Sequence, residues 1–80
     1  MPEQSPRAAA LVSLAGRLLY GPEWTSHLAA DLRLNDRTVR RIKAADAAGD
    51  DYPVAPGVFA DLRALLLDRA TQLAQLADRL

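Results

Sequence analysis

The apolar residues of this chain recur at intervals of three and four, which is the spacing of one face of an α-helix. The first such segment covers residues 7–20, preceded by Ser5 as the expected N-cap and Pro6 in the first turn. Gly21 and Pro22 end it. The apolar positions that we expect to face the core are Ala8, Leu11, Val12, Ala15, Leu18 and Leu19.

Two shorter helices follow, separated by a turn at residues 33–35. The second helix begins within residues 22–25, with Thr25 or Ser26 as its cap, and the third covers residues 36–48 with Asn35 as its cap. Gly49 stops the third helix. The expected inward positions are Leu28, Ala29 and Leu32 on the second helix, and Val39 and Ile42 on the third, where Ala45 can join them.

A fourth helix is predicted from Pro56 or Gly57 to the end of the chain, after a loop of about eight residues. At 1.5 Å per residue it is roughly 35 Å long, which is more than the other three helices can cover. Its first half closes the core. Its apolar positions are Val58, Phe59, Leu62, Leu65, Leu66, Leu73, Leu76 and Leu80.

The predicted fold is therefore all-α, with a single four-helix domain over residues 6–80 and a flexible arm at residues 1–5. Alanine and leucine, both strong helix formers, supply 16 and 14 of the 80 residues. Valine, isoleucine, threonine and aromatic residues are scarce, which argues against a β-rich fold.

Composition excludes several classes of chemistry. The chain has no cysteine and one histidine, His27, so we expect no disulfide, no thiolate site, no metal site and no cofactor. No nucleophile, base and orienting group come together as an enzyme needs, so we expect no catalytic residues. Apolar runs are far shorter than the roughly 18 residues of a membrane span. The N-terminus lacks the pattern of a signal peptide, which predicts a cytoplasmic protein without a membrane partner.

The net charge is zero, but the basic residues are concentrated in one short segment. Ten basic residues balance ten acidic ones, which argues against a polybasic protein that coats nucleic acid nonspecifically. Four of the ten basic residues nevertheless lie within residues 36–43: Arg37, Arg40, Arg41 and Lys43. With Val39 and Ile42 inward, helical spacing turns the three arginines outward.

The segment from Thr25 to Ala44 resembles the helix-turn-helix of phage repressors and Cro-type regulators. The positions that carry the resemblance are the small Ala29 and the apolar Leu28, Leu34, Val39 and Ile42. One departure is Arg33, which stands where the family usually has glycine in a left-handed conformation. Such a conformation costs a non-glycine residue about 1 kcal/mol.

This resemblance implies double-stranded DNA as the partner, with the third helix in the major groove. The implied base-contacting residues are Asp36, Arg37, Arg40, Arg41 and Ala44, of which Arg40 is also placed for a phosphate. The implied phosphate-contacting residues are Thr25, Ser26, His27, Asn35, Thr38 and Lys43.

Plainer interpretations stand beside these roles. The arginines can form a solvated helix face, with Asp36 and Arg40 as an ion pair one turn apart. Asp36 can act as a helix-terminal charge, Thr38 can pack inward and His27 can be an ordinary surface residue. Trp24 and Tyr20 are expected in the core or at its rim.

The end of the fourth helix predicts a homodimer. Leucines at Leu66, Leu73, Leu76 and Leu80 continue a seam that Arg69 interrupts, and no element of the chain is long enough to cover its end. In the alternative, the end folds back on the first helix or frays.

Together these features predict a sequence-specific transcriptional regulator, a dimeric repressor or autoregulator that reads an inverted repeat. Its size resembles that of regulators of phages and mobile elements. The rival hypothesis is a protein-interaction module, such as an antitoxin or adaptor, that uses the helical scaffold and the C-terminal leucine stripe. The zero net charge and the acidic residues Asp46, Asp50 and Asp51 favour it.

Overall fold

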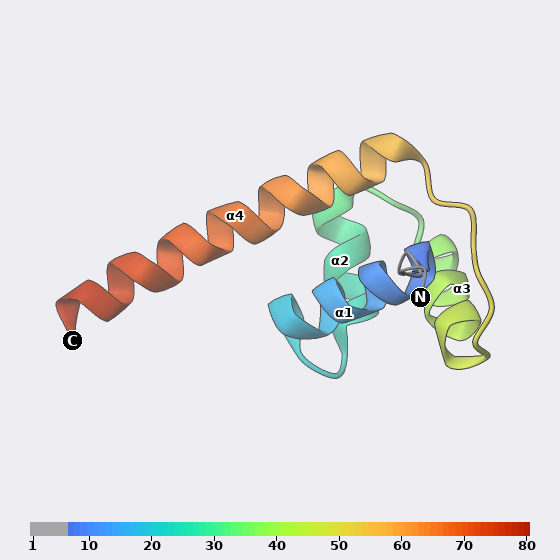
Figure 1. Ribbon diagram of the computed structural model, residues 1–80, viewed down its shortest axis with the longest axis horizontal. Coiled ribbons are helices and arrows are strands. Elements are labelled where there is room, and N and C mark those ends of the chain that lie inside the picture. The colour runs from blue at the N-terminus through green and yellow to red at the C-terminus, as the bar shows by residue number, and fades with distance from the viewer. Residues whose placement is uncertain (1–6) are drawn as a thin grey trace, which may run out of the picture.

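The computed structural model describes residues 7–80, and this part of the chain consists of four α-helices without a strand. They are α1 (Ala8–Tyr20), α2 (Trp24–Leu32), α3 (Asp36–Ala47) and α4 (Pro56–Arg79). The predicted all-α fold is confirmed. Helices α1, α2 and α3 pack on one another, and α4 lies across α1 and α2 without packing on α3 (Figure 1). The expected cap Ser5 and the arm at residues 1–5 lie outside the described residues.

The core lies where α1, α2 and α3 meet, and α4 closes it. Trp24 and Leu28 of α2 and Val39 of α3 are almost completely buried, and Leu62 is the buried residue of α4. The inward positions predicted for α2 and α3 are confirmed, because Leu28, Ala29, Leu32, Val39 and Ile42 are all buried.

The buried side of α1 agrees with the expected one only in part, because Val12, Ala15 and Leu19 are buried as expected. Leu11 and Leu18 were expected in the core, yet they are 41% and 74% exposed. The small residues Ala9, Ser13 and Gly16 are buried in their place. The Trp24 ring lies directly on Gly16, so α1 packs closely on α2 at this position, where a residue without a Cβ atom fits.

The helix ends agree with the sequence in part. Neither Thr25 nor Ser26 caps α2, because the helix already begins at Trp24 with Glu23 at its N-cap, which brings the indole into the core. Asn35 caps α3 as predicted, since its side chain accepts a 2.8 Å hydrogen bond from the backbone N–H of Arg37. At the other end of α3, Gly49 adopts a φ of +76°, and that helix stops as expected.

Helix α4 is continuous to Arg79, so its end does not fold back on α1. Its first half covers the core with Leu62 and the half-buried Val58, Phe59 and Leu65. Its second half projects beyond the other helices (Figure 1). The radius of gyration is 13.8 Å, whereas a compact domain of 80 residues has about 12 Å. Among residues 7–80, no helix is long and apolar enough to cross a membrane.

Candidate nucleic-acid interface

The turn between α2 and α3 is held by backbone hydrogen bonds. Leu34 donates its N–H to the carbonyl of Ala29 at 2.8 Å, and Arg33 donates to Ala30 at 3.2 Å. These two bonds and the left-handed backbone of Arg33, with φ 55° and ψ 40°, form a Schellman motif. The expected left-handed conformation at Arg33 is therefore confirmed, and Leu34 packs against the core. The turn fixes where α3 begins relative to α2.

Helix α3 has one buried side and one basic, exposed side. Val39 and Ile42 are 0% and 2% exposed, so they anchor the helix. The residues on the opposite side are all exposed: Arg37, Arg40, Arg41, Lys43 and Ala44. Because α4 packs on α1 and α2 only, no other described helix covers this side of α3.

The basic side chains of α3 have no ion-pair partner within the described residues, where Arg7 and Asp46 form the single ion pair, at 3.2 Å. The expected pair between Asp36 and Arg40 is therefore absent there. Asp36 lies exposed in the first turn of α3, where the helix dipole favours a negative charge. Thr38 is half-buried, in agreement with a packing role.

Three of the predicted phosphate-contacting residues lie on a different helix, α2. Thr25, Ser26 and His27 occupy the first turn of α2, at the end of that helix away from the Arg33 turn. Thr25 is half-buried, and Ser26 and His27 are exposed. The structure therefore divides the predicted site between the outer side of α3 and the beginning of α2.

His27 belongs to a cluster that sequence reasoning missed. Its ring stacks on Tyr20, with ring centroids 5.6 Å apart and an interplanar angle of 23°. The Tyr20 hydroxyl donates a hydrogen bond to the carboxylate of Asp31. Burial, followed by the hydrogen bond to Asp31 and its negative charge, raises the pKa of Tyr20 to about 12, although the charge of Arg69 opposes this shift. The cluster joins the end of α1 to α2.

Arg7 makes a second contact that periodicity did not indicate. Its guanidinium donates to the backbone carbonyl of Asp50 at 2.6 Å and to the carboxylate of Asp46 at 3.2 Å. The beginning of α1 is thereby tied to the end of α3. Asp46, which the rival hypothesis uses as part of an acidic cluster, is thus engaged within the chain.

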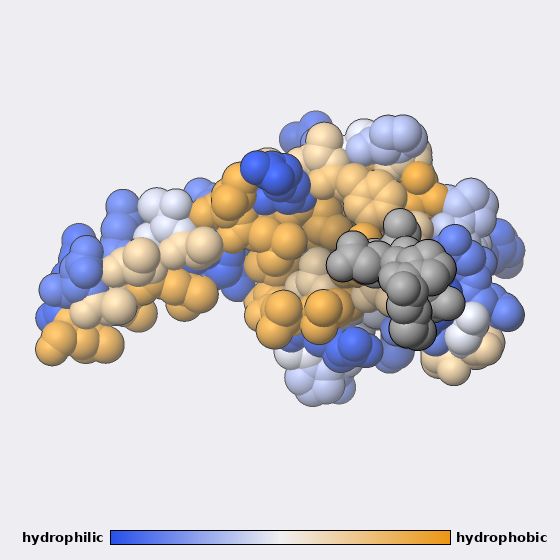
Figure 2. All heavy atoms as spheres, in the orientation of Figure 1, coloured by the Kyte–Doolittle hydropathy of each residue, from blue (hydrophilic) through white to orange (hydrophobic). Residues whose placement is uncertain are grey.

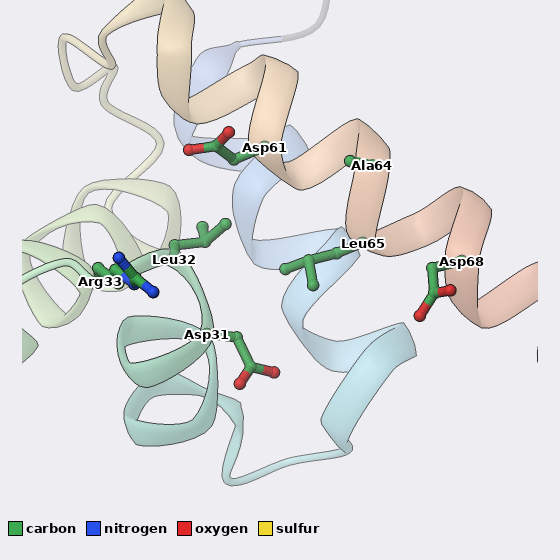
Figure 3. A pocket seen from close by; sticks show the side chains of 7 residues that line it. All are labelled: Asp31, Leu32, Arg33, Asp61, Ala64, Leu65 and Asp68. Atoms are coloured by element: carbon green, nitrogen blue, oxygen red, sulfur yellow. The ribbon is translucent and has the colours of Figure 1, made fainter.

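An acidic groove of about 480 Å³ lies between α2 and α4 (Figure 3). Its carboxylates are Asp31, Asp61 and Asp68, and Arg33 stands at its edge. No group of histidine, aspartate and glutamate side chains in residues 7–80 is arranged to hold a metal ion. Positive charge on α3 and negative charge between α2 and α4 make this neutral chain electrostatically polarised.

Comparisons of the chain with protein-family profiles, with curated proteins and with solved structures found no match.

Proposed function

We propose that this protein is a sequence-specific DNA-binding regulator of transcription that reads the major groove with α3. The observation that carries the proposal is the uncovered basic side of α3. It presents Arg37, Arg40 and Arg41 from a short helix that its buried side anchors in the core.

The dimensions of DNA suit this helix. The major groove is about 12 Å wide and admits one α-helix, and an arginine can donate two hydrogen bonds to O6 and N7 of a guanine. Arg37 and Arg41 are one turn apart and are our proposed base readers. Arg40 lies between them as a further base or phosphate contact, and Lys43 is a phosphate contact at the groove wall.

The polarised charge of the chain supports binding by one side only. The acidic groove between α2 and α4 repels phosphates, so an approaching duplex is oriented towards α3. We expect the bound form to be a dimer on an inverted repeat, with half-sites about 34 Å apart. Six to eight neutralised phosphates then lower the binding constant by about three to four orders of magnitude between 50 and 200 mM salt.

Binding is best measured by fluorescence anisotropy with the duplex upstream of the protein's own gene and with a scrambled duplex, at both salt concentrations. We expect salt-steep binding that favours the native duplex by about a hundredfold or more. If the protein binds both duplexes equally, its specific site lies elsewhere. That site is then identified by selection from random duplexes before the variants are compared. Absence of binding at 50 mM salt contradicts the proposal.

Substitutions on α3 test the assignment of individual residues. Arg37→Ala and Arg41→Ala should each weaken specific binding by about 1–3 kcal/mol and relax base preference at one position per half-site. Arg79→Ala, which removes an exposed arginine from the last turn of α4, is the matched control and should leave binding unchanged. Equal affinity of all three variants for the specific duplex refutes the role of α3.

The rival hypothesis of a protein-interaction module has one observation in its favour. Eight exposed leucines lie on α1 and α4, away from the basic side of α3: Leu11, Leu14, Leu18, Leu66, Leu67, Leu73, Leu76 and Leu80. If no DNA binds at low salt, this surface becomes the candidate site of action.

A further inference from the structure

An apolar surface extends from α1 onto α4. Leu11, Leu14 and Leu18 follow one another at intervals of three and four along α1, and they are 41%, 49% and 74% exposed. Beside them, an apolar groove of about 360 Å³ runs between α1 and α4. Its apolar lining is Leu11, Ala15, Phe59, Leu62, Leu66 and Leu67. Figure 2 shows this apolar surface over α1 and the adjoining part of α4.

The projecting end of α4 carries a matching apolar stripe. Leu73, Leu76 and Leu80 are 60%, 56% and 99% exposed, and no other described element reaches them. Figure 2 shows the same apolar colour continuing along one edge of this end. The groove and the stripe therefore belong to one chain but lie too far apart along α4 to cover each other.

The spacing along α4 suggests how two copies meet. Phe59, Leu66, Leu73 and Leu80 stand seven residues apart, which places them on nearly the same side of the helix. The first two border the groove, and the last two lie on the projecting end. The midpoint of this row falls between Arg69, which is bound to the end of α1, and Ala70, which is small and exposed.

We propose that a second copy of the chain covers this surface, with the two α4 helices antiparallel about a two-fold axis beside Ala70. In this register Leu73 lies opposite the partner's Leu66, and Leu80 lies opposite the partner's Phe59. The projecting end of each α4 then fills the groove of the other copy, next to the stripe of α1. Such an arrangement is isologous, so one surface serves both copies and the assembly closes as a dimer.

The exposed area agrees with a second copy as the occupant. The chain exposes 5971 Å², whereas a compact monomer of 8.7 kDa exposes about 4,700 Å². The excess of about 1,200 Å² exceeds the roughly 800 Å² that each partner contributes to a standard interface.

This inference is tested without DNA, so its failure can be told apart from a failure of the proposed function. Sedimentation equilibrium of the full chain should show a dimer at micromolar concentration. Leu73→Gln on the projecting end and Leu18→Gln on α1 should each raise the dimer Kd at least tenfold. Gln75→Ala, on the opposite side of α4, should leave the Kd unchanged. Because all three residues are exposed, circular dichroism should show the same helix content in every variant.

The proposal is overturned if the wild-type chain remains a monomer at 100 µM in sedimentation equilibrium. An unchanged dimer in Leu73→Gln also overturns it. A dimer that weakens in Leu73→Gln but not in Leu18→Gln overturns the role of α1.

The absence of cysteine allows a direct test of the register. A disulfide joins two residues whose Cα atoms lie about 4.4–6.8 Å apart. Ala70→Cys should therefore form a disulfide-linked dimer under mild oxidation, and Gln75→Cys should remain unlinked. If the two variants cross-link equally, or if Ala70→Cys does not cross-link, the antiparallel register is wrong.

Discussion

Arg69 of α4 donates a 2.9 Å hydrogen bond from Nη1 to the backbone carbonyl oxygen of Leu19 at the end of α1. Its guanidinium also lies 5.8 Å from the centroid of the Tyr20 ring. The last carbonyls of a helix lack partners within the helix, so the arginine satisfies one of them with a charged donor. The residue that interrupts the leucine pattern of α4 therefore fastens that helix to α1.

Replacing this arginine should loosen the contact of α4 with α1. Arg69→Met keeps an apolar, unbranched side chain but removes the hydrogen bond and the contact of the charge with the ring. We expect the free energy of unfolding to fall by about 1–2 kcal/mol, measured by urea denaturation. Arg79→Met, at an exposed position of the same helix, should have little effect. Equal losses in the two variants contradict the role of Arg69.

Gly16 should not tolerate even one added carbon atom. A Cβ atom at this position would lie 2.9 Å from Cζ3 of Trp24 and nearer still to two other atoms of the ring, which is buried and cannot move aside. Gly16→Ala should therefore destabilise the fold by about 1–3 kcal/mol, although alanine is the better helix former.

The matched control for this substitution is Gly57→Ala in the first turn of α4, where an added Cβ meets nothing within 4 Å. This variant should gain up to about 1 kcal/mol in the free energy of unfolding. Chemical denaturation of both variants measures their free energies of unfolding. A Gly16→Ala variant that is more stable than the wild type contradicts the prediction.

The left-handed backbone at Arg33 predicts that glycine at this position gives a more stable protein than alanine. Arg33→Gly removes the steric cost of this conformation, although glycine loses more backbone entropy on folding. We expect Arg33→Gly to be about 1 kcal/mol more stable than Arg33→Ala, which lacks the same charge but keeps the Cβ. Thermal unfolding of both variants measures the difference. Equal midpoints indicate that the conformation costs nothing in this turn.

The raised pKa of Tyr20 predicts that the protein loses stability at high pH. Its pKa rises from 10.0 to about 12 in the folded chain, so the folded state holds this proton more tightly than the unfolded state does. The resulting stabilisation is complete below pH 10 and disappears as the pH rises from 10 to 12. The melting temperature should therefore fall less steeply over this interval in Tyr20→Phe than in the wild type. Tyr52→Phe retains Tyr20 and should follow the wild type, whereas identical slopes in all three proteins contradict the prediction.

Local rules were sufficient for the parts of the structure that depend on near neighbours in the chain. The cap at Asn35, the turn at Arg33 and the stop at Gly49 each depend on side chains and backbone angles within a few residues. The buried sides of α2 and α3 also follow from spacing, because each helix has a single apolar side. The same spacing turns Arg37 and its basic neighbours outward, so the composition of the candidate interface was predictable, while its role in binding DNA stays a prediction.

The sequence by itself determined four helices, their approximate ends and the basic side of α3, because these features arise from local periodicity and capping. Only the tertiary structure decided which side of α1 is buried, since α1 carries apolar residues on two sides and the Trp24 ring selects the side with Gly16. The hydrogen bonds from Arg69 to Leu19, 50 residues away in the chain, and from Arg7 to Asp46, 39 residues away, also exist only in the tertiary structure. Periodicity gives the side that a residue faces within its own helix, whereas a contact between distant residues exists only once the helices have packed.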